Sequence, residues 1–113
     1  VVVGEVDPWH PTAVRGAAGL QFALPCRRVD AVTALTRPLI GFDAAGAPAA
    51  DVDPAGAFVF GSERYGLRPA TRGAVDRLVA LPMRPGVSSL NLATAVAAAL
   101  YGLAPPVTPP RGA

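Results

Sequence analysis

The sequence predicts a single α/β domain built around a largely parallel sheet. Short apolar runs alternate along the chain with segments that can form helices, and this alternation is typical of β-α-β units, whose strands are parallel. The composition agrees with a globular fold, since 51% of the 113 residues are hydrophobic and 16% are charged. A chain of this length is near the usual size of one domain and can bury a hydrophobic core.

The first part of the chain is predicted to form a strand, a turn and a helix. Residues 1–4 are a short apolar run followed by a polar turn, the pattern of a buried parallel strand. Pro11 can occupy the first position of a helix. Residues 12–24 can continue it, although Gly16 and Gly19 each cost about 1 kcal/mol relative to Ala. Two glycines three residues apart indicate a helix face against which another backbone packs closely.

The middle of the chain is predicted to contribute two of the strands of the sheet. Residues 27–35 are expected to form a short strand or turn followed by a short helix. The apolar run 39–42 is predicted to be a buried strand that closes in a turn at 43–46. Residues 47–56 contain two prolines and are predicted to be a surface loop, which leads into a further strand at 57–60.

The last part of the chain is predicted to hold a helix, a strand and a second, apolar helix. Residues 69–77 are expected to be helical, and residues 78–81 form the fourth strand. A loop then leads to a helix at residues 90–101, in which only three side chains can form hydrogen bonds. A helix that is apolar on nearly all sides is expected to be enclosed by protein. Gly102 fits the left-handed position that ends a helix.

The start of this apolar helix allows two interpretations. Ser88 or Ser89 can cap it by accepting a hydrogen bond from an N–H group of the first turn, which places Asn91 in that turn. The group is either a self-satisfied capping network or a ligand site at the positive end of the helix dipole.

The candidate site lies where ligands collect in parallel sheets, beyond the carboxyl ends of the strands. The loops after Phe42, at residues 61–67 and at residues 82–89 fall there. Gly61 and Gly66 allow close backbone approach or a positive φ. Glu63 lies between them and needs a partner, so the loop is either a structural arrangement of Glu63 with Arg64 or Asn91, or the wall of a polar pocket.

Several other chemistries do not fit the sequence. One His and one Cys argue against a clustered zinc site, and Asp51 and Asp53 are not followed by the glycine and glutamate of a calcium loop. We therefore expect no metal. Gly61 and Gly66 have the spacing of a P-loop but are not followed by its Lys-Ser/Thr pair.

The sequence also gives some indication of the environment of the protein. No apolar run approaches the roughly 20 residues of a membrane span, and no signal peptide is visible. The single cysteine, Cys26, cannot form an internal disulfide, which fits a reducing cytosol. All ten basic residues are arginine, a residue suited to phosphate recognition, but the net charge of +2 is a weak argument for a nucleic-acid partner. We expect a cytoplasmic protein with no membrane partner.

Three ordered segments carry a resemblance to a known family. Residues 58–67 (FVFGSERYGL), then 81–83 (LPM) and 89–93 (SLNLA), resemble the second and third motifs of the TrmH-like SPOUT RNA methyltransferases. Residues 10–19 are similar to the mid-domain segment of that family. The variants of these motifs look closest to the TrmJ-like branch, which modifies tRNA. The match covers residues 1–103, and the Pro-rich residues 104–113 are expected to be a flexible tail.

The resemblance implies a fold, a reaction and a set of site residues. The fold would have helices on both faces of the sheet and a deep C-terminal trefoil knot. S-adenosylmethionine would lie in the knot, and a methyl group would pass to a ribose 2′-oxygen of tRNA or rRNA. Family members are usually dimers, with the last helix in the interface. By position, Glu63 and Asn91 would be catalytic and Arg64 would bind RNA. The residues that would bind the cofactor are Phe42, Phe60, Gly61, Gly66, Leu81, Met83, Ser89 and Leu90.

One departure from the family pattern affects the functional prediction. The first family motif, Asn-x-Gly-x-x-x-Arg, supplies an arginine thought to activate the ribose hydroxyl, and it does not occur in these residues. Arg15 lies in the mid-domain segment and is not its equivalent. The chain is then either the C-terminal part of a longer enzyme, without the first strand and helix, or a homologue that has lost catalysis. The alternative functions are a non-catalytic knotted module that binds RNA or cofactor or dimerises, and a purely structural α/β domain.

Overall fold

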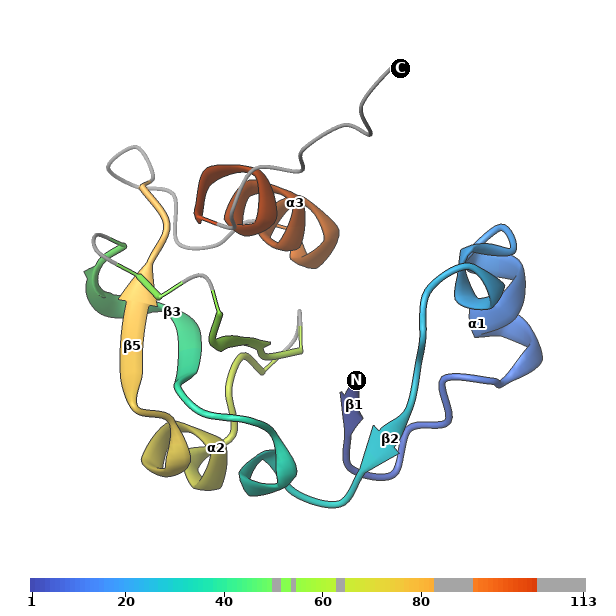
Figure 1. Ribbon diagram of the computed structural model, residues 1–113, viewed down its shortest axis with the longest axis horizontal. Coiled ribbons are helices and arrows are strands. Elements are labelled where there is room, and N and C mark those ends of the chain that lie inside the picture. The colour runs from blue at the N-terminus through green and yellow to red at the C-terminus, as the bar shows by residue number, and fades with distance from the viewer. Residues whose placement is uncertain (50–51, 54, 63–64, 83–90, 104–113) are drawn as a thin grey trace. The chain divides into compact units, whose positions relative to one another are not determined.

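The computed structural model describes residues 1–49, 52–53, 55–62, 65–82 and 91–103 (Figure 1). The chain divides into two compact units, Val1–Leu35 and a second unit that begins at Thr36. Within the described ranges, no helix is both long and apolar enough to cross a lipid bilayer.

The first unit is built on a short pair of parallel strands. Strand β1 (Val2–Val3) pairs with β2 (Arg28–Val29) in parallel, and the N–H of Val2 donates to the carbonyl of Arg27 at 2.9 Å. The unit also contains helix α1 (Pro11–Gly16) and the 3₁₀ turns η1 (Leu20–Phe22) and η2 (Val32–Ala34). The parallel strand at residues 1–4 is therefore confirmed, and so is the strand followed by a short helical turn at residues 27–35.

Helix α1 begins as the sequence predicts but ends earlier. Pro11 is in its first turn, and the Nδ1 atom of His10 accepts a hydrogen bond from the N–H of Thr12 at 3.2 Å. The prediction of one helix over residues 12–24 is wrong, because the chain leaves the helix after Gly16 and Gly19 adopts a φ of 82°. A Cβ atom on either glycine would meet nothing within 4 Å. The predicted close backbone packing is thus absent from the described residues, and Gly19 instead supplies a left-handed conformation.

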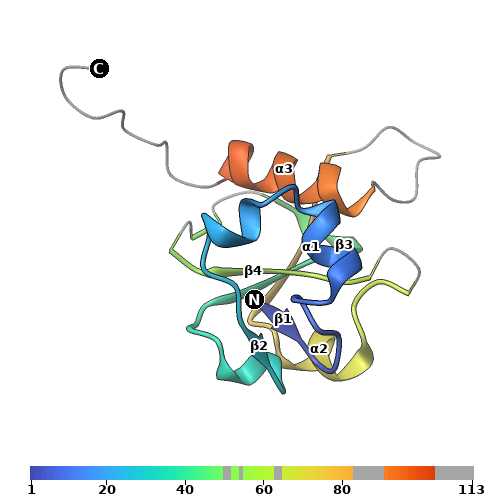
Figure 2. The ribbon, with the colours of Figure 1, turned by 90° about the vertical axis from the view of Figure 1, so that its right-hand side faces the viewer.

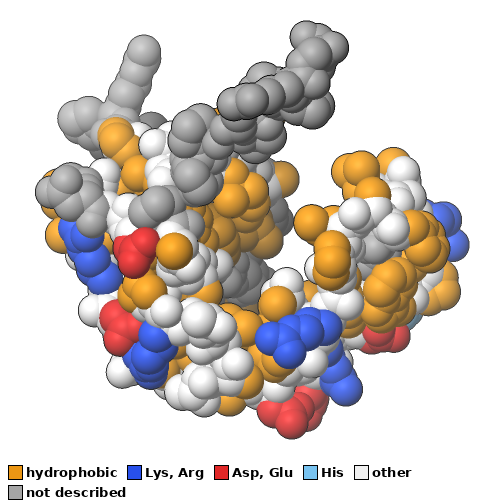
Figure 3. Space-filling view, in the orientation of Figure 1, with side chains coloured by type: hydrophobic (Ala, Val, Ile, Leu, Met, Phe, Trp, Pro, Cys, Tyr) orange, Lys and Arg blue, Asp and Glu red, His pale blue; other side chains and the backbone are white. Residues whose placement is uncertain are grey.

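Much of the apolar surface of the first unit is exposed. The rings of Trp9 and Phe22 lie 5.8 Å apart, yet Phe22 is 75% exposed. Figure 3 shows apolar side chains over the face of this unit that is turned to the viewer. Val1 and Val3 are also exposed, so the prediction that the first strand is buried is wrong for this chain by itself. A two-stranded pair is too small to cover both of its own faces.

The second unit contains a three-stranded parallel sheet in the order β4-β3-β5, in which the neighbours β3 and β5 are labelled in Figure 1. Its strands are β3 (Leu39–Pro48), β4 (Ala57–Phe60) and β5 (Arg77–Ala80). The core lies on the central strand and its neighbour, where Leu39, Ile40 and Val79 are buried. The mixed α/β class with parallel sheets is confirmed, and the strands predicted at 57–60 and 78–81 are present within one residue.

The predicted turn at residues 43–46 is a bulge inside β3. Phe42 and Ala47 both pair with Val79, so the four residues between them bulge out of the ladder. The carboxylate of Asp43 accepts a hydrogen bond from the N–H of Ala45 at 2.8 Å within this bulge. The strand therefore continues to Pro48 instead of closing at Phe42, and the predicted surface loop begins two residues later than expected.

The two helices of the second unit differ from their predicted bounds. Helix α2 (Pro69–Ala74) ends three residues before the predicted end, because Asp76 is used in a contact with β3. Helix α3 (Leu92–Leu103) continues through Gly102, so the prediction that Gly102 ends it is wrong. Ser88 and Ser89, the predicted caps, lie outside the described residues.

Helix α3 runs along one side of the second unit (Figure 2), and it is only partly covered. Ala99 is buried, but Leu100 is 52% and Tyr101 94% exposed. The prediction that protein encloses this helix on nearly all sides is therefore wrong within this single chain. Its composition is apolar on nearly all sides, but the described residues leave the side with Leu100 and Tyr101 exposed.

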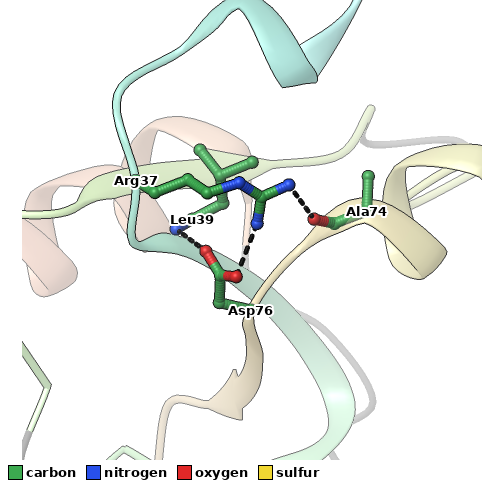
Figure 4. Close-up of polar contacts among 4 residues, drawn as sticks. All are labelled: Arg37, Leu39, Ala74 and Asp76. Carbon is green, nitrogen blue, oxygen red and sulfur yellow. Dashed lines mark hydrogen bonds and ion pairs between the residues drawn. The ribbon is translucent and has the colours of Figure 1, made fainter.

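Asp76 clamps the amino end of β3 to the segment before β5 (Figure 4). Its carboxylate accepts hydrogen bonds from the N–H of Leu39 at 2.7 Å and from the guanidinium of Arg37. Its own N–H donates to the carbonyl of Leu39 at 2.8 Å, and Arg37 also donates to the carbonyl of Ala74. The hydrogen bond from Leu39, with a smaller contribution from Arg37, lowers the pKa of Asp76 below its ordinary value of 3.8.

This clamp predicts an acid-sensitive fold. A carboxyl group whose pKa is lower in the folded state stabilises the fold above its unfolded pKa, and this stability is lost as the pH falls through the folded value. We expect the free energy of unfolding to decrease as the pH drops below about 3.8. In the Asp76→Asn variant, the free energy of unfolding should depend less on pH. Urea unfolding followed at several pH values tests this, with the exposed Asp30→Asn as the matched control. A pH dependence unchanged by Asp76→Asn would contradict the assignment.

Candidate functional site

The described part of the predicted site lies at the carboxyl edge of the β4-β3-β5 sheet. Phe42 is paired in register with Phe60 on β4 and with Val79 on β5. Gly61 follows β4 directly and Leu81 follows β5 directly. Phe60, Gly61 and Leu81 are thus at the carboxyl ends of β4 and β5, and Phe42 is next to them on β3, directly before the bulge. Met83, Ser89 and Leu90 lie outside the described residues.

Phe42 is the centre of an aromatic cluster at this edge. Its ring stacks on that of Phe60, with centroids 4.7 Å apart and planes at 9°, and it meets the ring of Phe58 at 5.4 Å and 59°. Residues that pair in register point to the same face of a sheet, so Phe42, Phe60 and Val79 share one face. This cluster makes a rigid apolar wall, because aromatic pairs of this kind add to the stability that burial gives.

The loop after β4 closes tightly on its two glycines. The N–H of Gly66 donates to the carbonyl of Ser62 at 2.9 Å, and the N–H of Ser62 donates back to Gly66 at 3.2 Å. A Cβ atom on Gly61 would lie 2.0 Å from the carbonyl carbon of Gly66, and Gly66 has a φ of 66°. Both glycine predictions are therefore confirmed, close approach at Gly61 and positive φ at Gly66. Glu63 and Arg64, which this loop contains, lie outside the described residues.

Asn91 is the N-terminal cap of α3. Its Oδ1 atom accepts a hydrogen bond from the N–H of Ala93 at 3.0 Å, and its carbonyl accepts one from the N–H of Ala95 at 2.8 Å. The capping function predicted for a serine is thus carried, among the described residues, by Asn91 itself. The cap uses only the side-chain oxygen of Asn91. The two N–H groups of the same side-chain amide take no part in it.

Asp43 is a residue near the site that sequence reasoning missed. Its carboxylate forms an ion pair with Arg72 of α2, and its side chain is only 16% exposed. The sequence placed Asp43 in a turn and Arg72 in a helix, 29 residues apart. No local pattern connects two residues so distant in the chain. Among the described residues, no group of three or more His, Cys, Asp or Glu side chains could hold a metal ion.

Comparison with known proteins identifies the family to which the chain belongs. Residues 1–101 match the SpoU rRNA Methylase family, and the chain belongs to this family, as the resemblance of its motifs predicted.

Two relatives give more detail. Over 51 residues, 43% of this chain and 33% of the relative, the sequence is 49% identical to a tRNA (cytidine(34)-2′-O)-methyltransferase from Burkholderia pseudomallei (strain 1106a). The structure is similar to the SpoU methyltransferase AviRb from Streptomyces viridochromogenes, solved in complex with the cofactor AdoMet. That similarity has a TM-score of 0.76 and 32% identity, and it covers 88% of this chain and 46% of the other. The chain therefore spans less than half the length of both relatives.

The close approach of Gly61 to Gly66 predicts that one methyl group added at Gly61 lowers the stability of the fold. Gly61→Ala would press a Cβ atom into backbone that cannot rotate away, and overpacking of this kind costs about 1–3 kcal/mol. Gly73→Ala is the matched control, since Gly73 is in α2 and a Cβ atom there meets nothing within 4 Å. It should leave the stability unchanged or raise it by up to about 1 kcal/mol. Urea unfolding measures both, and equal effects of the two substitutions would contradict the tight loop.

Proposed function

We propose that the chain carries the cofactor-binding part of an S-adenosylmethionine-dependent RNA methyltransferase that acts on a ribose 2′-oxygen of tRNA or rRNA. The observation that carries the proposal is the family match over residues 1–101. It is supported by a relative that is a tRNA 2′-O-methyltransferase and by a similar structure that contains AdoMet.

The residues at the strand ends fit S-adenosylmethionine. The stacked rings of Phe42 and Phe60 offer an apolar wall, and the glycines Gly61 and Gly66, which have no side chain, allow a ligand to approach the backbone next to that wall. These four residues would hold the cofactor together with Leu81, Met83, Ser89 and Leu90. The cofactor supplies the methyl group on a sulfonium ion.

The contribution of the chain to the reaction would be positioning. Methyl transfer is an in-line displacement, so holding the ribose oxygen in line with the methyl group contributes much of the rate. We assign Glu63 and Asn91 to the catalytic side and Arg64 to an RNA phosphate. The hydrogen bond from Ala93 fixes the Asn91 amide at the start of α3, which is the rigid support that a positioning role needs.

The proposal includes the finer features that the resemblance implies. These are helices on both faces of the sheet, a deep trefoil knot in the C-terminal part, and a cytoplasmic location where tRNA is the substrate. They also include residues 1–103 as one methyltransferase domain. The family match supports a single domain, because it spans both compact units.

The partner of α3 would be a second copy of the chain. The inward face of the helix contains Leu92, Ala95, Val96, Ala99 and Leu103, whereas Leu100 and Tyr101 are on an exposed face with Ala93, Thr94, Ala97 and Ala98. Thr94 is the only member of the exposed face that is not apolar or aromatic. An apolar face of this kind favours a homodimer with α3 in the interface.

Tyr101→Arg tests the dimer. An arginine in the middle of an apolar interface is costly to desolvate, so we expect the variant to sediment with the monomer mass of 11.4 kDa at concentrations where the unaltered chain is dimeric. Ala70→Arg, exposed on α2, is the control and should leave the dimer intact. A monomeric unaltered chain, or a dimer unaffected by Tyr101→Arg, would contradict this assignment.

A non-catalytic module is the second candidate function. It applies if no Asn-x-Gly-x-x-x-Arg segment, a motif that does not occur within these 113 residues, acts together with them. Such a module would bind S-adenosylmethionine or RNA without transferring a methyl group. A radiolabelled-methyl assay on tRNA and rRNA separates the two functions, because transfer by this chain excludes the module.

The role of Asn91 gives a sharper test of the proposal. We expect micromolar-range binding of S-adenosylmethionine by calorimetry, weakened by Asn91→Ala and by Ser89→Ala. Asn91→Ala also removes the cap, a loss of about 1 kcal/mol of stability, whereas Asn91→Ser retains a capping oxygen. Asn91→Ser should therefore restore the unfolding free energy but not the cofactor affinity. Full restoration of affinity by serine would reduce Asn91 to a structural cap, and a folded chain without cofactor heat would contradict the proposal itself.

A further inference from the structure

Asp43 holds the bulge of the central strand in a fixed shape. One carboxylate oxygen accepts the N–H of Ala45 inside the bulge at 2.8 Å, and the other accepts a hydrogen bond from Nη1 of Arg72. Both oxygens are thus engaged, and the side chain is mostly buried. A buried carboxylate is costly unless it is paired in this way, so the bulge and α2 are held together.

The two faces of β3 place this ion pair directly behind the aromatic cluster. Side chains alternate between the faces of a strand, and a Cβ atom on Gly41 would lie 3.1 Å from Leu67 and 3.3 Å from Val75, the residues that flank α2. The face that carries Gly41 is therefore covered by the residues that flank α2. Phe42 projects to the opposite face, toward Phe60, and it is the residue immediately before Asp43. The backbone of Phe42 is fixed on both sides, by packing at Gly41 and by the ion pair at Asp43.

The ion pair of Asp43 with Arg72 connects two walls of the candidate cofactor site. The bulge at 43–46 continues from Phe42, and α2 follows the tight loop of Gly61 and Gly66 by only two residues. A contact between the bulge and α2 therefore sets the position of one wall relative to the other.

We propose that Asp43 and Arg72 are positioning residues for the cofactor site, which hold the Phe42 ring and the two glycines Gly61 and Gly66 at the separation that S-adenosylmethionine requires. This inference rests on the proposed function, because it takes S-adenosylmethionine as the ligand. Neither residue needs to touch the cofactor. Their effect is to preorganise the pocket, which raises affinity by lowering the cost of ordering it on binding.

The chain contains a matched control for this pair at the amino end of the same strand. Arg37 and Asp76 also form an Arg–Asp ion pair, also in the second unit and also between β3 and the segment near α2 (Figure 4). The two pairs differ in their location, because Arg37 and Asp76 are at the amino end of β3, away from the carboxyl edge. A purely structural contribution should be shared by both pairs, whereas an effect on cofactor affinity should belong to Asp43 and Arg72.

The test measures the dissociation constant for S-adenosylmethionine by calorimetry, at a temperature where unfolding curves show every variant to be folded. Asp43→Asn and Arg72→Gln should each raise the dissociation constant roughly fivefold or more, and the double variant should be little worse than either, since interacting partners are not additive. Arg72→Lys retains the charge and should restore most of the affinity. Asp76→Asn and Arg37→Gln should lower the unfolding midpoint but change the dissociation constant less than about twofold.

The outcomes separate this inference from the proposed function. If the unaltered chain binds S-adenosylmethionine and Asp43→Asn binds it equally well, the inference is overturned and the proposed function stands. If Asp76→Asn weakens binding as much as Asp43→Asn, the effect is general destabilisation and the inference is also overturned. If the folded, unaltered chain does not bind S-adenosylmethionine, the proposed function fails and the inference fails with it.

Discussion

The parallel pairing of β3 with both β4 and β5 is the interaction on which the second unit depends. It buries Leu39, Ile40 and Val79 between the strands and the segments around them, and it gives three chain segments a common carboxyl edge. Phe42, Phe60 and Leu81 are far apart in the sequence and reach this edge only through the register of the ladder. A shift of one residue in the pairing of β3 with β4 would turn Phe42 and Phe60 to opposite faces, so this register determines whether the aromatic wall exists.

The central strand is held at its amino end and at its bulge by an arginine–aspartate pair, and the two pairs act on different parts of the fold. At the amino end, Asp76 accepts from the backbone of Leu39 and from Arg37, which fixes where β5 starts. In the middle of the strand, Asp43 shapes the bulge and connects it to α2. Exposed ion pairs contribute little to stability. The more buried Asp43 and the backbone-bonded Asp76 are the members whose geometry matters most.

The sequence predicted the elements whose signals are local. The strands at 57–60 and 78–81 were found because short apolar runs are bounded by turn residues, and Gly61 and Gly66 because only glycine fits a closed loop of that kind. The break after Gly16 was missed, since helix propensity alone does not decide between α and 3₁₀ turns. The ion pair of Asp43 with Arg72 depends on contacts between distant segments, and the exposed face of α3 depends on what other molecules cover it. Neither property is encoded in a local pattern.

The central claim is that the carboxyl edge of β4-β3-β5 binds S-adenosylmethionine, and a residue-resolved titration tests it most directly. Backbone amide resonances of the isotope-labelled chain would be followed by NMR as the cofactor is added. The account predicts saturable shifts at Phe42, Gly61, Gly66 and Leu81, with Leu39 and Asp76 at the opposite end of the sheet unchanged. Shifts confined to the amino end of the sheet or to α1, or no shifts at saturating cofactor, would contradict it.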